Sequence, residues 1–320
     1  MLRETHVDEE KAKRSERNVA VRVERLRKTY NSVVAADDVS FDVYEAEIFG
    51  MVGPNGAGKT TTIECIEGLR RPDSGNIKVF DLDPRRDGYA LRARIGVQLQ
   101  QSALQERVRV WEAMELFASF YSRSADWRAL LEQLGLTEKR NAAFESLSGG
   151  QRQRLFVALA LVNDPELVFF DELTTGLDPH ARRAMWELVR GIREKGKTVF
   201  LTTHFMEEAE RLCDRVAIMD RGRIVALDTP ENLIRTLGAE NRVVFTVEGP
   251  FDPQPLCGLP GVTRVEATGE RIVVYGRGDM VVVEVVNALA SKRIPFRDLR
   301  TEQPNLEDVF LTVTGHEMRD

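Results

Sequence analysis

The hydrophobic residues of this chain form two kinds of pattern that alternate over its first two thirds. Short, almost wholly apolar runs are expected for strands covered on both faces of a parallel sheet, and they occupy residues 47–52, 167–170 and 198–202. Apolar residues at helical spacing occupy residues 60–69, much of 109–162, and 180–195. Residues 19–23 and 39–43 alternate between apolar and polar, as strands with one exposed face do. The pattern predicts an α/β fold with a mostly parallel core sheet, further β structure and a helical part.

The character of the chain changes near residue 237. Alternation typical of strands returns at residues 243–247, 264–267 and 271–275, and helical spacing follows at 280–291 and 306–312. Residues 1–18, in contrast, mix both signs of charge with few apolar residues. We therefore expect three parts: a flexible charged extension at residues 1–18, a large α/β domain at 19–236, and a small α+β domain at 237–320.

Composition narrows the functional classes. The chain has 320 residues and a net charge of −6, so it lacks the broad basic surface of a nucleic-acid-binding protein. No apolar run approaches the roughly 18–20 residues that cross a bilayer, and the first residues do not resemble a secretory signal. Three scattered cysteines, Cys65, Cys213 and Cys257, do not suggest disulfides or a metal cluster, and we expect them to be buried.

A glycine-rich loop is the first candidate for chemistry. Residues 53–60 read Gly-Pro-Asn-Gly-Ala-Gly-Lys-Thr between a predicted strand and a predicted helix, which is the context of a nucleotide phosphate-binding loop. Its glycines let backbone amides approach the phosphates, and the following helix adds a favourable dipole. Lys59 would bind the β- and γ-phosphates and Thr60 would bind Mg²⁺. The alternative is that Lys59 is a solvated surface lysine.

Two carboxylates follow the apolar strand at 167–170. Asp171 would lie at the carboxyl edge of the sheet, where ligands of α/β proteins bind and where Mg²⁺ would offset its burial. Glu172 is placed to act as the general base that polarises the attacking water. The alternative is that Glu172 only caps the start of a helix.

A second glycine-rich segment reads Leu-Ser-Gly-Gly-Gln at residues 147–151, about ninety residues after the phosphate loop. The two segments, in this order and followed by Asp171 and Glu172, resemble the nucleotide-binding domain of an ABC transporter. The resemblance implies a P-loop ATPase fold with an antiparallel β subdomain and a helical subdomain that carries the second segment. It also implies ATP and Mg²⁺ as cofactors and a head-to-tail dimer of two copies of this chain. Each ATP would lie between the phosphate loop of one copy and residues 148–151 of the other.

The resemblance also assigns roles to further residues. Gln100 would contact Mg²⁺ and the attacking water, although Gln98 and Gln101 leave the register open. His204, in a Thr-Thr-His-x-x-Glu-Glu-Ala segment, would contact the γ-phosphate, and Tyr30 would stack on adenine unless it is a plain surface tyrosine. The predicted catalytic residues are Lys59, Glu172 and His204, and the predicted metal ligands are Thr60, Gln100 and Asp171. The predicted nucleotide-binding residues are Tyr30, Gly53, Pro54, Asn55, Gly56, Ala57, Gly58, Lys59, Thr60, Thr61, Gln100, Ser148, Gly149, Gly150, Gln151, Asp171 and Asp178.

Residues 305–315, Asn-Leu-Glu-Asp-Val-Phe-Leu-Thr-Val-Thr-Gly, are similar to the end of the daunorubicin/doxorubicin-resistance-type exporter ATPases. The alternative is that they only form an amphipathic helix on the small domain. One departure from the family is Leu173, where proline often follows the two carboxylates. The resemblance implies an ATPase at the cytoplasmic face of the membrane that powers a separate permease, with a drug, antibiotic, lipid or other hydrophobic compound as cargo. A regulatory, repair or translation-associated ATPase with the same dimer is the alternative.

Overall fold

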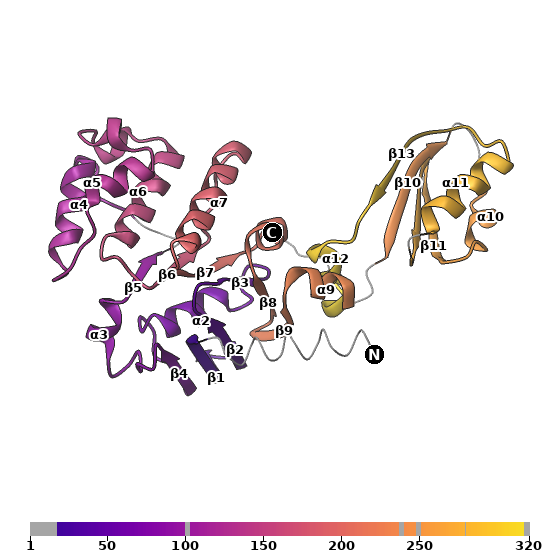
Figure 1. Ribbon diagram of the computed structural model, residues 1–320. Helices are drawn as coiled ribbons and strands as arrows, with labels where there is room; N and C mark the ends of the chain where they lie inside the picture. The colour runs from indigo at the N-terminus through magenta and orange to yellow at the C-terminus, as the bar shows by residue number, and fades with distance from the viewer. Residues whose placement is uncertain (1–17, 100–102, 237–239, 248–250, 279, 317–320) are drawn as a thin grey trace. The chain divides into compact units, whose positions relative to one another are not determined.

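The computed structural model describes residues 18–99, 103–236, 240–247, 251–278 and 280–316 (Figure 1). The chain forms two compact units, and the boundary between them follows Pro230. The expected boundary at 236/237 therefore lies at the other end of helix α9 (Pro230–Thr236), most of which belongs to the second unit. Of the extension expected at residues 1–18, only Asn18 lies within the described residues.

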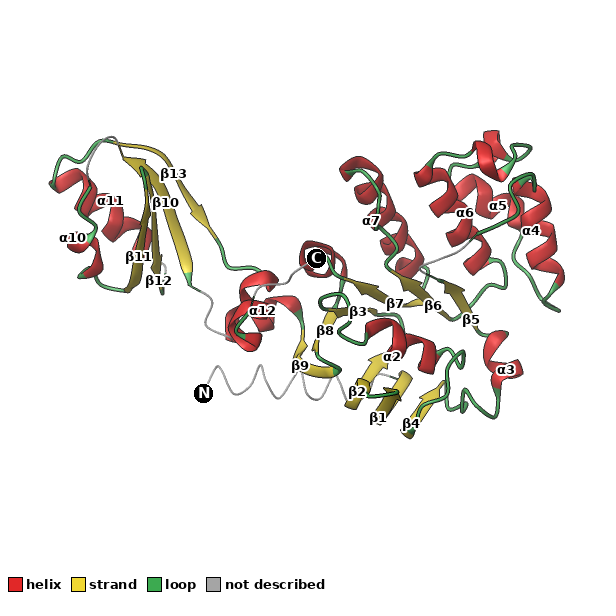
Figure 2. Ribbon diagram, turned by 180° about the vertical axis from the view of Figure 1, so that it is seen from behind, coloured by secondary structure: helices red, strands yellow, loops and turns green. Residues whose placement is uncertain are grey.

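Two sheets form the framework of the first unit (Figure 2). The larger has the strand order β5-β6-β7-β3-β8-β9, in which only β9 runs antiparallel to its neighbour. The smaller is antiparallel, with the order β2-β1-β4. The strands are β1 (Val19–Tyr30), β2 (Val33–Tyr44), β3 (Ile48–Val52), β4 (Ser74–Val79), β5 (Ile95–Gln98), β6 (Leu167–Asp171), β7 (Thr198–Thr203), β8 (Arg215–Asp220) and β9 (Arg223–Asp228).

The helices of the first unit are α2 (Lys59–Ile66), α3 (Gly88–Arg92), α4 (Val110–Ser119), α5 (Trp127–Gln133), α6 (Gly149–Leu161), α7 (Pro179–Glu194) and α8 (Met206–Leu212). Helix α2 packs against strands of both sheets, whereas α4, α5 and α6 pack against one another as a helical group, in which α6 also packs against β5 (Figure 1). The helical stretch expected within residues 109–162 is therefore divided into three α-helices, and the connection between α5 and α6 contains two short 3-10 helices, Thr137–Lys139 and Phe144–Ser146. Among the described residues, no helix is both long and apolar enough to cross a bilayer.

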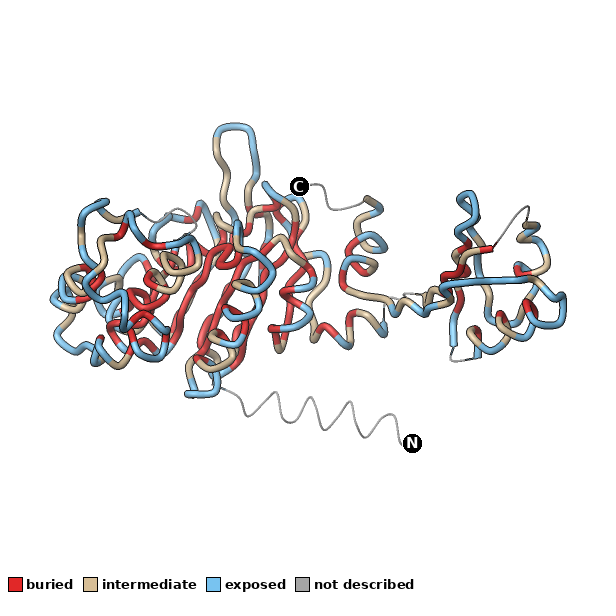
Figure 3. The backbone as a smooth tube through the Cα atoms, turned by 90° about the horizontal axis from the view of Figure 1, so that it is seen from above, coloured by how far each residue is buried: buried red, intermediate tan, exposed pale blue. Residues whose placement is uncertain are grey.

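The core of the first unit forms where apolar strands meet α2. Every residue of β6 and β7 is buried, which explains why both segments are continuous apolar runs (Figure 3). Phe41, Phe49 and Phe200 form an aromatic cluster between the two sheets, with the rings of Phe41 and Phe49 stacked at 5.2 Å. Ile63 and Ile66 of α2 complete the same core. This packing fixes the position of α2, and with it the loop that precedes the helix.

The second unit contains a four-stranded antiparallel sheet, in the order β11-β12-β10-β13, against which helices α10 and α11 pack. Its strands are β10 (Asn241–Val247), β11 (Val262–Thr268), β12 (Arg271–Gly276) and β13 (Phe296–Glu302), and its helices are α10 (Gln254–Cys257), α11 (Val281–Ser291) and α12 (Leu306–Thr314). Val243, Phe245 and Leu289 belong to its core. Asn305 caps α12 by accepting a hydrogen bond from the backbone amide of Asp308 at 3.1 Å.

The structure corrects one expectation about the cysteines. Cys65 and Cys213 are buried as expected, but Cys257 is exposed. It ends the short helix α10, where Leu256 supplies the buried side chain and Cys257 points to the other side. The expected burial of Cys257 was therefore wrong, because a four-residue helix buries only part of its circumference.

Candidate active site

The phosphate loop leads from the end of β3 to the first turn of α2, at the carboxyl edge of the parallel strands. Gly58 precedes α2 with φ of 102°, and a Cβ atom at this position would lie 2.0 Å from the carbonyl oxygen of Ala35. A Cβ atom on Gly53 would likewise lie 2.1 Å from the carbonyl oxygen of Met219. Only glycine fits at these two places. The loop is thus held tightly against neighbouring strands, with the N-terminus of α2 behind it.

Lys59 begins α2 and is only 4% exposed. Its Nζ atom donates hydrogen bonds to the carbonyl oxygens of Gly53 at 2.8 Å and Pro54 at 3.1 Å. Burial lowers the pKa of Lys59, while the negative charges of Glu172 and Asp171 oppose that shift. The alternative of a solvated surface lysine is excluded by this environment.

Asp171 is the last residue of β6 and is 3% exposed. Its neighbour in the adjoining strand β7 is Thr202, whose hydroxyl donates a hydrogen bond to Asp171 Oδ1. Burial raises the pKa of Asp171 and Glu172 raises it further, whereas hydrogen bonds from Thr202 and Thr60 and the charge of Lys59 act in the opposite direction. A buried carboxylate with too little positive charge around it is a favourable site for a cation.

Glu172 follows directly, with φ of 51° and an exposed fraction of 9%. Its backbone amide donates to the carbonyl oxygen of Thr202 at 3.1 Å, which fixes the turn after β6. Its carboxylate lies between two other side chains: His204 Nδ1 is 3.3 Å from Oε1, and the Thr175 hydroxyl donates to Oε2 at 3.3 Å. Because α7 begins seven residues later, at Pro179, Glu172 does not cap a helix. The capping alternative is therefore excluded.

The side chains at this edge of the sheet fit a magnesium ion bound together with phosphates. Asp171 and Thr60 supply the hard oxygen atoms that Mg²⁺ prefers. The two carboxylates Asp171 and Glu172 face one ammonium group, Lys59, which leaves a local excess of one negative charge. In the described part of the chain, no group of three or more His, Cys, Asp or Glu residues could hold a metal ion.

The segment at residues 148–151 lies on the helical group. Ser148 caps α6: its Oγ accepts from the Gln151 amide at 3.4 Å, and Gln151 Oε1 accepts from the Ser148 amide at 3.0 Å. Ser148 and Gly149 are exposed, and Gly150 faces Ala181 at the start of α7. Within the described ranges, no hydrogen bond or ion pair joins these residues to the phosphate loop. The two glycine-rich segments therefore precede different helices: the phosphate loop leads into α2, and residues 148–151 begin α6 in the helical group (Figure 1).

Asp178 lies close to that segment, as the residue that caps α7. Its Oδ1 atom accepts hydrogen bonds from the backbone amides of His180 and Ala181, both at 2.9 Å. These two hydrogen bonds hold the pKa of Asp178 below its usual value, and the bond from Ala181 has the larger effect. The exposed carboxylate is thus fixed in one orientation at a helix N-terminus.

Tyr30 and the glutamines are the remaining candidates. Tyr30 ends β1, and its half-buried ring lies 5.4 Å from Lys28 Nζ and 5.3 Å from the guanidinium carbon of Arg70. Two cations thus border the ring. Gln100 and Gln101 lie outside the described residues. Gln98, in β5, is 4% exposed and donates from Nε2 to the carbonyl oxygen of Leu99 at 2.7 Å.

Sequence reasoning did not assign roles to the hydroxyls that hold the two carboxylates. Thr202 bonds Asp171 through its side chain and Glu172 through its backbone, and Thr175 bonds Glu172. Thr202 stands two residues before His204, so its place in the Thr-Thr-His segment was a usable signal. Thr175 is one of two adjacent threonines after the carboxylates and carries no such signal.

Comparisons with known proteins place the chain among similar sequences and structures. The family model described as "ABC transporter" matches residues 36–175. The Nod factor export ATP-binding protein I of Paraburkholderia xenovorans is 41% identical over 309 residues, which cover 94% of this chain and 99% of that protein. The protein of the same name from Bradyrhizobium diazoefficiens is 39% identical and is covered to 98%.

Solved structures give the same result for the fold. The ATP-binding subunit of an ABC transporter superposes with a TM-score of 0.62 and 29% identity, over 68% of this chain and 93% of that one. A dimeric bacterial ABC transporter cassette gives a TM-score of 0.59 and 28% identity, over 65% of this chain and 98% of that one. Its post-hydrolysis state, bound to ADP and Pi, is equally similar, with a TM-score of 0.59.

Proposed function

This chain belongs to the ABC transporter family as an ATP-binding, ATP-hydrolysing subunit, and we propose that it powers export through a separate transmembrane permease. The observation that supports this proposal best is the arrangement at the carboxyl edge of the core sheet. Lys59, Asp171 and Glu172 act on one another electrostatically there, and His204 lies against Glu172. A phosphate-binding lysine, a buried carboxylate for a cation and a second, oriented carboxylate are the groups that ATP hydrolysis requires.

We propose the following roles within one nucleotide site. Lys59 and the backbone of the loop bind the β- and γ-phosphates, and Tyr30 stacks on adenine. Thr60 and Asp171, with Gln100, would hold Mg²⁺, which neutralises charge on the phosphates during transfer. Glu172 accepts a proton from the attacking water, and His204 keeps the carboxylate of Glu172 in place while also reaching the γ-phosphate.

We propose that two copies of the chain form the complete sites, head to tail. The support is the separation of the two glycine-rich segments within one chain, together with the exposure of Ser148 and Gly149 at the N-terminus of α6. A capped helix N-terminus with two glycines fits the γ-phosphate of an ATP held by the other copy. Asp178 would face the partner from the start of α7. Loss of the γ-phosphate removes these contacts, so nucleotide state would shift the dimer between closed and open forms.

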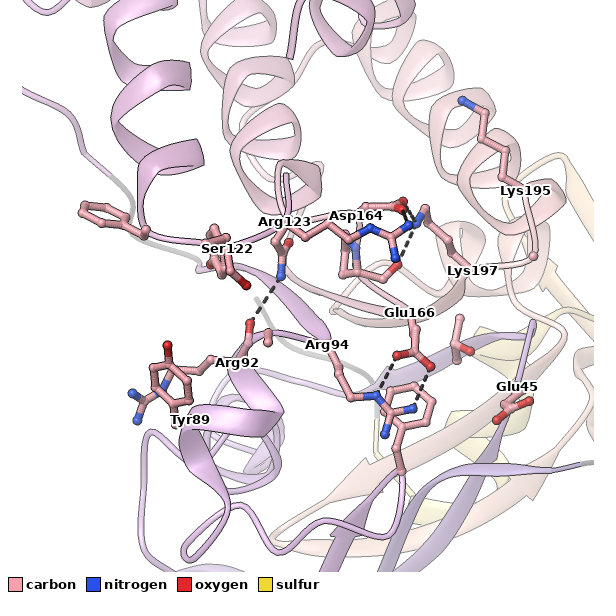
Figure 4. Close-up of a pocket in the computed structure, with 18 residues that line it drawn as sticks. Glu45, Tyr89, Arg92, Arg94, Ser122, Arg123, Asp164, Glu166, Lys195 and Lys197 are labelled. Atoms are coloured by element: carbon pink, nitrogen blue, oxygen red, sulfur yellow. Dashed lines mark hydrogen bonds and ion pairs between the residues drawn. The ribbon is translucent and has the colours of Figure 1, made fainter. Parts of the chain in front are cut away.

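We propose that the permease contacts a surface beside β5, from the residues before its start to those along the strand. Two adjoining cavities there, of about 450 and 700 Å³, share Arg92 and Tyr121 in their walls. Large apolar side chains are exposed around them, including Tyr89 (90%), Phe120 (66%) and Leu69 (56%). In the larger cavity, Arg94 pairs with Glu166 and Arg123 with Asp164, across from Tyr89 (Figure 4). Exposed apolar residues gathered in this way favour a protein partner.

The direction and cargo of transport are also proposals. The similar proteins quoted above are named for Nod factor export, which supports export for this chain. The similarity of residues 305–315 to daunorubicin/doxorubicin-resistance-type subunits supports a hydrophobic cargo, such as a drug, an antibiotic or a lipid, and hence a multidrug efflux role. We place the subunit at the cytoplasmic face of the membrane, where ATP is available to it.

Reconstitution tests this function. The subunit should hydrolyse ATP with release of phosphate, and it should co-purify with a multi-span permease sought among the products of adjacent genes. Membrane vesicles that contain both proteins should move a hydrophobic fluorescent cargo only when MgATP is present on the subunit's side. Hydrolysis without any membrane partner, even when the neighbouring permease is co-expressed, would contradict the transport role.

A further inference from the structure

Glu208 is a buried carboxyl group on α8, four residues after His204. It is 2% exposed, whereas Glu207 and Glu210 on the same helix are exposed. Burying a carboxyl group is costly unless hydrogen bonds compensate for the lost water. Burial raises the pKa of Glu208, and the hydrogen bond from Thr203 opposes that shift most strongly. None of the roles proposed for the nucleotide site involves Glu208, so its burial calls for an explanation.

Donors from two different elements reach the Glu208 carboxyl group. Trp186 of α7 donates from Nε1 to Oε1 at 3.0 Å, and both side chains are buried. The hydroxyl of Thr203, the last residue of β7, donates a second hydrogen bond. Arg182 of α7 adds a positive charge nearby. The carboxyl group therefore links α7 to the residue that directly precedes His204.

The turn that carries His204 is held on both sides of the histidine. Thr203 Oγ1 accepts a hydrogen bond from the backbone amide of Phe205 at 3.0 Å, so this hydroxyl connects Glu208 with the residue after His204. The guanidinium carbon of Arg182 lies 4.2 Å from the centre of the Phe205 ring, and the centres of the Phe205 and His204 rings are 4.0 Å apart. Side chains of α7 and α8 thus fix both neighbours of the histidine.

We propose that Glu208 is a positioning residue for ATP hydrolysis, which holds His204 in the orientation that brings its Nδ1 atom against Glu172. The inference rests on the proposed function, because it concerns how His204 and Glu172 act. The two side chains are 3.3 Å apart, and a shift of the turn that carries His204 would break their contact. A group misplaced by about 1 Å can slow catalysis about a hundredfold, so the support behind the histidine matters for turnover.

Substitutions of Glu208 in the complete subunit test the inference. Glu208→Ala removes the acceptor for both donors, and we expect ATP turnover to fall at least about fivefold with little change in KM for MgATP, because the phosphate loop is intact. Glu208→Gln can still accept from Trp186 and can donate to the Thr203 hydroxyl, so it should keep at least about half of the wild-type turnover. Glu207→Ala is the matched control: Glu207 lies on the same helix, is exposed and pairs with Arg211, and its loss should leave turnover unchanged.

The variant His204→Ala separates positioning from a general loss of structure. If Glu208 acts through His204, Glu208→Ala should slow the wild type but should not slow His204→Ala any further. Turnover is expressed per copy that binds a fluorescent ATP analogue, so that unfolded copies are not counted. Should Glu208→Ala fail to fold, Thr203→Val takes its place, because it removes the hydroxyl that connects Glu208 to the turn. The same result is then expected in both backgrounds.

The outcomes distinguish this inference from the proposed function. Wild-type turnover by Glu208→Ala, or the same fold reduction with and without His204, would show that Glu208 does not position the histidine. Turnover by Glu208→Gln as low as that of Glu208→Ala would overturn the hydrogen-bonded link. Wild-type turnover by His204→Ala itself would instead remove the proposed role of the histidine, and this inference with it.

Discussion

His204 Nδ1 lies 3.3 Å from Oε1 of Glu172, although the two residues are 32 positions apart and follow different strands. The contact exists because β6 and β7 are parallel neighbours, with Asp171 opposite Thr202, so that both strands end at the same edge. Glu172 directly follows the end of β6, and His204 directly follows the end of β7. The imidazole side chain is 16% exposed, so it remains accessible beside the more deeply buried carboxylate.

The role of Glu172 predicts a stalled enzyme. Glu172→Gln should bind ATP but hydrolyse it at least about a hundredfold more slowly, because the general base is lost. ATP-bound dimers should then accumulate, and sedimentation with saturating MgATP measures them. Glu207→Gln is the control, since Glu207 is exposed and pairs with Arg211 one helical turn away. Near-normal phosphate release by Glu172→Gln would remove Glu172 as the base.

The contact between His204 and Glu172 predicts non-additive kinetics. His204→Ala should lower ATP turnover at least about tenfold, with little change in ATP affinity, because the carboxylate loses the side chain that orients it. The double variant His204→Ala, Glu172→Gln should be no slower than Glu172→Gln alone. If the double variant instead showed the product of the two single rate reductions, the histidine would act independently of Glu172.

Removal of the Thr202 hydroxyl should lower both the stability and the activity of the subunit. Thr202→Val keeps the shape of the side chain but removes the hydroxyl that bonds Asp171, and we expect a loss of about 1–3 kcal/mol in the free energy of unfolding. The MgATP concentration for half-maximal turnover should rise, because Asp171 loses its orientation. Urea unfolding and phosphate release measure the two effects.

Thr198→Val provides the matched control at the other end of β7. Thr198 is equally buried, and its hydroxyl accepts from the Ala46 amide at 3.0 Å, remote from the phosphate loop. It should lower stability by a similar amount without changing the MgATP dependence. Equal changes in MgATP dependence for both threonine variants would mean that Thr202 acts only through stability.

The elements that the sequence predicted well are those whose pattern depends on burial alone. The strands at 167–170 and 198–202 are observed as β6 and β7 within one residue at each end, because all of their residues lie inside the sheet. Strand β13 (Phe296–Glu302) was missed: it is a mostly exposed edge strand with four charged residues, so its pattern resembles a loop. The order of strands within each sheet also had no local signal.

The same limit applies to the candidate site. The phosphate loop could be located from sequence, because its glycines are required by local backbone geometry and close approach, as at Gly58. The neighbours of Asp171 and Glu172 could not, since Thr202 and His204 reach them only through the pairing of β6 with β7. The burial of Glu67 could not be predicted for a related reason. A glutamate near the end of a helix is ordinarily exposed, and only the packing around α2 buries this one.

Glu67 gives a prediction about pH. Its pKa is raised from 4.5 to about 9, chiefly by burial and further by Asp171 and Glu64. The folded protein therefore keeps a proton that the unfolded chain loses, and this contribution to stability is complete below the unfolded pKa of 4.5 and declines as pH rises towards 9. Relative to Glu67→Gln, the wild-type subunit should lose up to about 1.4 kcal/mol of unfolding free energy per pH unit across that window.

Urea unfolding of the isolated subunit at several pH values within the window measures this difference. Glu207→Gln serves as the control, because Glu207 is exposed, pairs with Arg211 and is not among the groups that shift the pKa of Glu67, so it should follow the wild type in its pH dependence. A difference between Glu67→Gln and wild type that stayed constant with pH would mean that the carboxyl is already ionised in the folded subunit.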